Sequence, residues 1–151
     1  MIKIICVGKI KEKFFVQALN EYTKRLKKYT KLEIIELEDE SVGTTSQIID
    51  KESNKILEKI KDDDYTILLD IKGISIDSLE FADRLSKLTW QYKNIVFIIG
   101  GSYGVNEDIK NRVKLLLSFS KFTFPHQLFR VVLLEQIYRA YRINSNESYH
   151  K

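Results

Sequence analysis

The sequence is poor in several residue types: its 151 residues include one cysteine, one proline, two histidines and six glycines. One cysteine cannot form a disulfide within the chain, and Cys6 lies in an apolar run, so we expect a buried, reduced thiol. The scarcity of proline and glycine leaves little room for linkers. Together with the length, it predicts a single domain over residues 1–151.

Long hydrophobic runs are absent as well. No run approaches the length of a membrane-spanning helix, and the apolar run that begins at Met1 has ended by Lys9, which is too short for a signal peptide. We therefore expect a cytoplasmic protein with no membrane partner.

Motifs of several enzyme classes are missing. The chain contains no H-E-x-x-H or G-x-S-x-G motif, no dinucleotide fingerprint and no P-loop. Two acidic clusters, at residues 36–40 and 62–64, have no accompanying histidine or further clustered ligand. We interpret them as a solvated loop and a polar turn, and we expect no metal site.

The net charge of +4 comes from the last third of the chain. Residues 1–100 carry 17 basic and 17 acidic side chains, whereas residues 101–151 carry 8 basic and 4 acidic ones. This excess is typical of a solvated face. It would indicate a polyanionic partner only if the charges converge on one site.

Strand-like and helix-like patterns alternate along the chain. Apolar runs predict strands at residues 2–7, 32–37, 65–71 and 94–99, the third of them ended by Lys72-Gly73. Apolar residues spaced three and four apart predict helices over 11–29, 44–60, 77–88 and 127–143. Thr44 or Thr45 is the expected N-cap of the helix over 44–60, and a further short helix is expected to begin at Asn106. This order indicates an α/β fold with a largely parallel sheet and helices on both faces.

Three strand ends are polar or rich in glycine: Leu69-Asp70 with Gly73, Gly100-Gly101, and the stretch 118–125. If the three strands are neighbours, their loops converge on one pocket at the carboxyl edge of the sheet, where open α/β sheets bind ligands. The spacing G-G-x-x-G after the fourth strand fits either a tight turn or a close approach of backbone to a planar ligand.

Residues 118–127 connect an apolar run to the last helix and contain the only proline, Pro125. Phenylalanines alternate there with Ser, Lys and Thr, but the proline argues against a central strand and holds the connection rigid. His126 follows directly, and its pattern leaves open whether it faces the pocket or only begins the helix.

The last predicted helix is apolar over more than half of its circumference. One sheet face does not offer enough surface to bury it, so we predict a homodimer formed through this helix, with a simple core helix as the alternative. Arg139 and Arg142, spaced i, i+3, share its remaining polar side.

Five segments carry long and specific patterns: residues 4–9 (I-x-x-V-G-K), 97–104 (F-I-I-G-G-S-x-G), 117–127 (L-S-F-S-K-x-T-F-P-H-Q), 130–140 (R-V-V-L-x-E-Q-x-Y-R-A) and 149–151 (Y-H-K). With them the chain resembles, over essentially its full length, the small bacterial SPOUT-class methyltransferases of the ribosomal RNA large subunit methyltransferase H family. These enzymes methylate N3 of a pseudouridine in 23S ribosomal RNA.

The resemblance implies S-adenosylmethionine as the methyl donor, a homodimer, and a C-terminal trefoil knot of the SPOUT type. Carried over by position, the cofactor-binding residues are Leu69, Gly100, Phe119, Ser120, Lys121, Phe122, Thr123 and Phe124. They coincide with the three strand ends identified above from polarity and glycine content alone.

The resemblance also directs attention to the C-terminal tail. We expect His150, with Tyr149, to shape the substrate pocket once RNA is bound, and Arg139, Arg142 and Lys151 to contact RNA phosphates. A frayed tail without function is the alternative. The chain departs from the family just before the tail, where Ser145-Asn146 stands in place of Arg-Gly and removes one charge and a glycine hinge.

The function expected from the resemblance is methylation of 23S ribosomal RNA, with the assembled ribosome as substrate. Two alternatives remain. The chain could methylate another RNA, such as tRNA, or it could be a basic RNA-binding or assembly module without catalytic activity.

Overall fold

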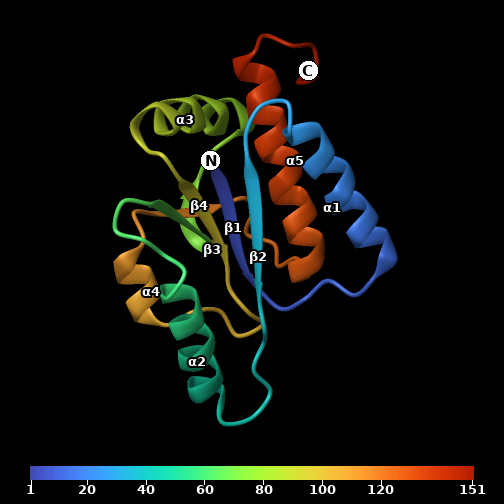
Figure 1. Cartoon of the computed structure of the whole chain (residues 1–151). Coiled ribbons are helices and arrows are strands. Elements are labelled where there is room, and N and C mark those ends of the chain that lie inside the picture. The colour runs from blue at the N-terminus through green and yellow to red at the C-terminus, as the bar shows by residue number, and fades with distance from the viewer.

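The computed structural model describes residues 1–151 and contains five strands: β1 (Ile2–Val7), β2 (Leu32–Leu37), β3 (Tyr65–Ser75), β4 (Ile95–Ile99) and β5 (Leu115–Ser118). All neighbouring strands are parallel, and they form one sheet in the order β2-β1-β4-β3-β5 (Figure 1). The helices are α1 (Lys13–Leu26), α2 (Thr45–Leu57), α3 (Ser78–Gln91), α4 (Glu107–Arg112) and α5 (His126–Asn144).

Helices cover both faces of the sheet, as the alternating pattern predicted. Helices α1, α3 and α5 pack on one face and α2 and α4 on the other. Strand β1 is buried along its whole length, and its side chains alternate between the two sides: Ile2 and Ile4 join the core beneath α5, whereas Ile5 and Val7 join the core beneath α2 and α4.

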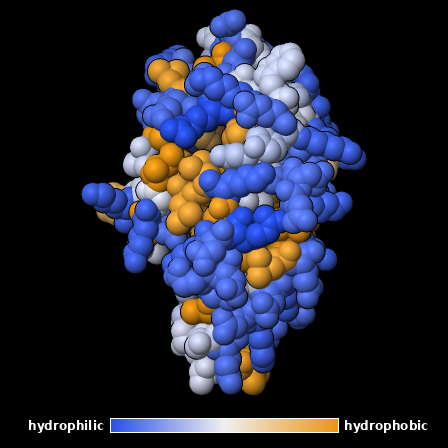
Figure 2. Space-filling view, turned by 90° about the vertical axis from the view of Figure 1, so that its left-hand side faces the viewer, coloured by the Kyte–Doolittle hydropathy of each residue, from blue (hydrophilic) through white to orange (hydrophobic).

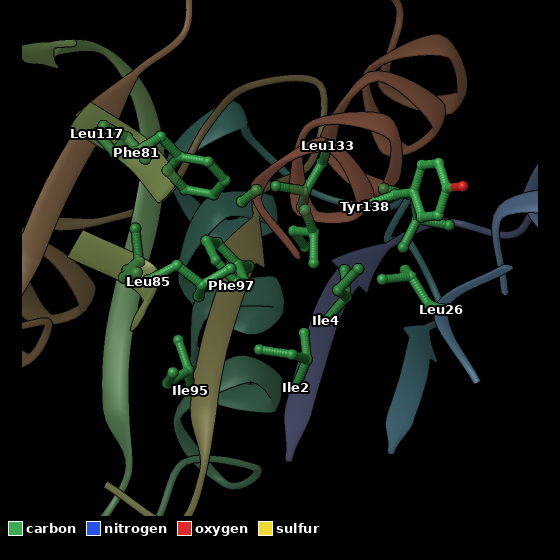
Figure 3. Close-up of a cluster of buried hydrophobic side chains, with 14 of the residues drawn as sticks. Ile2, Ile4, Leu26, Phe81, Leu85, Ile95, Phe97, Leu117, Leu133 and Tyr138 are labelled. Atoms are coloured by element: carbon green, nitrogen blue, oxygen red, sulfur yellow. The ribbon is translucent and has the colours of Figure 1, made fainter. Parts of the chain in front are cut away.

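The larger core lies between the sheet and the helices α1, α3 and α5. Figure 3 shows side chains from these helices pointing toward the strands, among them Phe81, Leu133 and Tyr138 around Phe97 and Ile4. Helix α5 lies between α1 and α3 and so contributes the central part of this layer.

Local signals set several boundaries. Thr44 forms a capping box with Gln47 at the start of α2, and the side chains of Asp77 and Asn106 cap α3 and α4. Cys6 is fully buried, and burial raises the pKa of its thiol to about 11, so it is protonated at neutral pH.

No group of three or more His, Cys, Asp or Glu side chains is arranged so that it could hold a metal ion. The turn at residues 62–64 is polar, as interpreted: the buried Asp64 carboxylate accepts hydrogen bonds from the Lys61 backbone N–H at 3.0 Å and from the Asn94 amide at 2.9 Å. None of the five helices combines the length and the apolar character that crossing a membrane requires.

Strand β3 does not end at Lys72-Gly73, as the sequence predicted, but runs on to Ser75. Its pairing with β5 shifts register between Leu69 and Ile74, so the residues between them form an irregular segment inside the strand. The shift requires the backbones to approach closely, since a Cβ on Gly73 would lie 2.5 Å from the Leu116 carbonyl carbon. Gly73 therefore permits the pairing instead of ending it.

We expect Gly73→Ala to lower the free energy of unfolding by about 1–3 kcal/mol, the usual cost of forcing an extra carbon into a packed site. Chemical denaturation would measure this change. Lys72→Ala, at the exposed neighbouring position, is the matched control and should change stability by less than about 0.5 kcal/mol. Equal stability of the two variants would contradict the close approach of β3 and β5.

Candidate active site

The three strand-end loops predicted to converge do meet, at the carboxyl ends of β3, β4 and β5. They enclose a pocket, here called the apolar pocket, of about 740 Å³ when the space open to solvent is included. Ten of its 18 lining residues are hydrophobic. The lining comprises residues 68–71 from β3, residues 99–101, 104 and 105 around the end of β4, residues 117–120 and 122–124 from β5 and the loop after it, and His126 and Phe129 of α5.

The glycine segment after β4 forms a tight turn. The Gly104 N–H donates to the Gly101 carbonyl oxygen at 3.0 Å, and Gly104 has a φ of 83°. Gly101 also allows close packing, because a Cβ at this position would overlap the carboxylate of Glu52 from α2. The tight-turn interpretation is confirmed, and the turn also borders the apolar pocket.

The loop at residues 119–125 is anchored at both ends by aromatic contacts. The Phe119 ring packs edge-on against Phe81 and Phe129, with centroids 5.9 and 5.4 Å away, and Phe124 stacks on Phe129 at 6.1 Å. Between these anchors the Ser120 hydroxyl accepts a hydrogen bond from the Phe122 N–H at 3.0 Å. The loop is therefore held in shape by the chain itself.

Several backbone donors of this loop have no partner within the chain. The N–H groups of Lys121, Thr123 and Phe124 make no intramolecular hydrogen bond. Free amides beside an apolar wall suit a ligand with an aromatic ring and acceptor atoms at its edge. An adenosine group has both features, so these residues fit the cofactor that the resemblance implies.

The structure places seven of the eight predicted cofactor-binding residues on the lining of the apolar pocket: Leu69, Gly100, Phe119, Ser120, Phe122, Thr123 and Phe124. Lys121 belongs to the same loop, but it is exposed and is not among the lining residues. The assignment of these residues to a cofactor remains a prediction.

A second cavity, here called the polar hollow, adjoins the apolar pocket. Ten of its 11 lining residues are not hydrophobic, and its volume is about 950 Å³ including the part open to solvent. Only Gly101 and His126 line both cavities. The others are Val7, Gly8, Lys9, Lys11, Glu38, Asp39, Ser102, Gln127 and Arg130.

His126 is the first residue of helix α5 and also faces the two cavities. The sequence left open which of these two descriptions applies, and both do. It follows Pro125, the N-cap residue, as the first residue of the helix. Burial lowers the pKa of His126, and the nearby charge of Arg130 lowers it further, while Glu52 acts in the opposite direction. The imidazole is therefore neutral at physiological pH.

Arg130 is a structural residue of the site whose role the sequence analysis missed. Its side chain is 2% exposed, and its guanidinium pairs with the Glu36 carboxylate at 2.7 Å. It also donates to the carbonyl oxygens of Val7 and Gly8 at 3.1 and 2.5 Å. The contacts tie the first turn of α5 to the ends of β1 and β2. An arginine inside an otherwise apolar helical run was the available signal.

The predicted catalytic residues Tyr149 and His150 are not brought to the apolar pocket of their own chain. They follow the far end of α5, whose 19 residues span roughly 28 Å, and their contacts are with the C-terminal half of this helix. The tail folds back on this end of the helix: the Tyr149 hydroxyl donates to Glu135 at 3.1 Å, and His150 Nδ1 lies 3.2 Å from Arg139. Burial and the hydrogen bond to Glu135 raise the pKa of Tyr149 to about 12.

Asn146 makes this fold-back possible. Its φ of 54° lies in the left-handed region, which asparagine tolerates better than most residues. The asparagine thus gives the turn that the glycine of the family pattern would otherwise supply.

The predicted phosphate-contact residues Arg139 and Arg142 are already engaged within the chain. Arg139 makes a two-pronged contact with Glu135, at 2.6 and 3.1 Å. Arg142 pairs with Glu147 at 3.0 Å and donates to the Ser148 carbonyl oxygen. Lys151, at the end of the tail, is exposed. The three lie together at the end of the molecule away from the apolar pocket, and their contact with RNA remains a prediction.

Comparison with known proteins agrees with this geometry. A family model described as predicted SPOUT methyltransferase matches residues 1–150. A protein of Clostridium botulinum (strain Kyoto / Type A2) named ribosomal RNA large subunit methyltransferase H is 54% identical, and the match covers 99% of each chain. Proteins of the same name from Clostridium novyi and Caldicellulosiruptor saccharolyticus are 50% and 47% identical, over 99% and 100% of both chains.

We expect Glu36→Gln to lower the free energy of unfolding by roughly 3 kcal/mol, because Arg130 would stay buried without a counter-charge. Glu33→Gln, an exposed site on the same strand with no ion pair, is the matched control. Denaturant unfolding of both variants measures the difference. A loss no larger than the control's would show that the ion pair does not anchor α5.

Proposed function

Because the chain belongs to the SPOUT methyltransferase family, we propose that it transfers a methyl group from S-adenosylmethionine to N3 of a pseudouridine in 23S ribosomal RNA. We place this activity on the assembled ribosome. The proposal rests on one observation above all: three strand-end loops, matched in a family of methyltransferases, converge on a preformed apolar pocket with unpaired backbone amides.

The apolar pocket would hold the cofactor. Phe119, Phe124 and Leu69 would cover the faces of the adenosine, and the free N–H groups of Thr123 and Phe124 would meet its acceptor atoms. Asp70 is the one acidic side chain of the lining, which suits a cationic ligand. When bound, S-adenosylmethionine supplies a methyl group on a positively charged sulfur, so the protein itself needs no nucleophile.

The chain's own contribution is alignment and exclusion of water. The loop at residues 119–125 is rigid before any ligand binds, since aromatic contacts fix both of its ends. A preformed pocket holds the two reactants in line at little cost in entropy. The same apolar walls keep water away from the reacting atoms.

A trefoil knot is part of the proposal. The chain leaves the edge strand β5, crosses back through residues 119–125 and enters α5, which packs between α1 and α3. We place the knotted crossing in this segment, so that the loop that holds the cofactor is also the loop that closes the knot.

We further propose a homodimer formed through α5. The helix buries one side in its own core, but Leu128 remains 37% exposed and the nearby loop residues Phe122 and Phe124 are exposed by 78% and 36%. Figure 2 shows that a hydrophobic patch also lies among hydrophilic side chains on the face at the left-hand side of Figure 1. A second copy would cover Leu128, Phe122 and Phe124.

Dimerisation would also give the tail a role. Since Tyr149 and His150 lie at the far end of α5 from their own pocket, they could complete only the pocket of a partner subunit. The arginines and Lys151 of the tail would then stand beside the RNA bound there.

Two experiments separate the proposed function from its alternatives. Calorimetry with S-adenosylmethionine should give a heat of binding, whereas a module without a working pocket should give none. Mapping modified nucleotides in a strain that lacks the gene should reveal a missing N3-methylpseudouridine in 23S ribosomal RNA, restored by the gene. A missing mark in tRNA with intact 23S ribosomal RNA would support the other substrate class.

We expect His150→Ala to reduce turnover with little change in cofactor affinity, because the tail meets the RNA and not the cofactor. The variant Leu69→Trp fills the pocket of its own subunit. When equal amounts of the two variants exchange subunits, about a quarter of the wild-type sites should be restored, because half of the dimers are hybrids and each hybrid has one intact site. Steady-state methylation assays measure this recovery. Two inactive variants that stay inactive after exchange of subunits would contradict a tail acting on the partner's pocket.

A further inference from the structure

The junction between the two cavities has a chemistry that cofactor binding does not use. His126 lines both the apolar pocket and the polar hollow, and neither of its ring nitrogens makes a hydrogen bond within the chain. Behind the adjacent Gly101 lies Glu52, a carboxylate only 3% exposed. A free imidazole backed by a buried carboxylate, between an apolar and a polar cavity, is suited to moving a proton.

We propose that the polar hollow seats the target base, that His126 is the catalytic residue that takes up its imide proton, and that the nearby buried carboxylate of Glu52 supports the imidazolium that results. This inference rests on the proposed function, because it assumes that the apolar pocket holds the methyl donor.

The lining of the polar hollow matches a uracil-type ring. The edge of such a ring presents two carbonyl oxygens on either side of an N–H group. Lys9, Lys11, Ser102 and the amide NH2 of Gln127 offer donors to the carbonyl oxygens, and the buried Gln127 Oε1, which has no hydrogen-bond partner, offers an acceptor to a ring N–H group. The two lysines would also stabilise the negative charge that develops on the ring as its proton leaves.

His126 has the protonation state that a base requires. Burial and the charge of Arg130 keep its pKa below the ordinary value, so one ring nitrogen carries a free lone pair at neutral pH. The charged groups around the ring are Arg130 on its own helix with Glu36 behind it, Glu52 from α2, and Lys9, Lys11, Glu38 and Asp39 at the rim of the polar hollow.

Glu52 would stabilise the imidazolium once it forms. One of its oxygens accepts the Glu40 backbone N–H at 3.0 Å, and the other is buried with no partner. No basic side chain pairs with this carboxylate. A buried charge with a free oxygen is costly for folding alone, and its effect on His126 is to favour the protonated ring.

In this step one proton and one methyl group change partners. The N3 proton passes to the His126 ring nitrogen, and the N3 lone pair forms a bond to the methyl carbon. The carbon–sulfur bond breaks, and its electron pair remains on sulfur, which becomes a neutral thioether. His126 then releases the proton to solvent through the open polar hollow.

The test uses His126→Ala and His126→Gln in the full chain, with ribosomes from a strain that lacks the methylation as substrate. Single-turnover methylation should fall at least about 100-fold at neutral pH, and the defect should shrink as pH rises, because the imide then ionises without a base. Added imidazole should restore part of the rate of His126→Ala. Because His126 also lines the apolar pocket, the rates are compared at saturating S-adenosylmethionine, and calorimetry measures the cofactor affinity of each variant.

A second readout does not depend on activity. NMR titration of the His126 ring should show its pKa lowered further by Glu52→Gln, since the stabilising carboxylate charge is gone. Glu58→Gln, at an exposed position just beyond α2, is the matched control and should leave the titration unchanged.

The activity assays test the role of His126, and the NMR titration tests the role of Glu52. Full activity of His126→Ala, or a defect that is the same at every pH and is not rescued by imidazole, would overturn the role of His126. A titration unmoved by Glu52→Gln would overturn the role of Glu52. Failure of the proposed function looks different, because the wild-type chain itself would then methylate no ribosomal RNA.

Discussion

The contact on which the site depends most is the buried guanidinium of Arg130. It joins the first turn of α5 to the carboxyl ends of β1 and β2 through Glu36, Val7 and Gly8. The position of α5 in turn fixes Phe129, against which the loop at residues 119–125 packs. The buried charge of Arg130 thus helps to set the geometry of both cavities. An apolar side chain could pack at this position, but it could not make the hydrogen bonds that the guanidinium makes.

In the proposed mechanism, the two cavities would divide the work of the reaction between them. The apolar pocket is built from strand ends and aromatic rings and would bind its ligand by shape and by backbone amides. The polar hollow is built from side chains on β1, on the loops after β1, β2 and β4, and on the start of α5, and it carries most of the nearby charge. Methyl transfer needs both environments, one dry and one able to manage charge and protons.

Sequence patterns were sufficient for most elements, because helix periodicity, the Thr44 cap and buried strand runs are local signals. They also located the apolar pocket, since parallel strand ends must share an edge of the sheet. Sequence patterns missed the features that depend on contacts between residues far apart in the sequence. Gly73 looked like a strand end because its neighbour in the sheet, β5, comes 42 to 45 residues later in the chain. The roles of Glu52 and Arg130 depend on contacts with residues in other parts of the sequence. The periodicity of apolar residues does not reveal such contacts.

The strand order has a consequence for how the protein is made. Strand β1 lies between β2 and β4, with Ile2 beside Ile95, and the core above it is closed by α5 at the end of the chain. Contacts of such long sequence separation form slowly, and these cannot form during early synthesis because the partners do not yet exist. We therefore expect the nascent chain to leave its own ribosome before either cavity is assembled, so that the chain becomes competent only as a finished molecule.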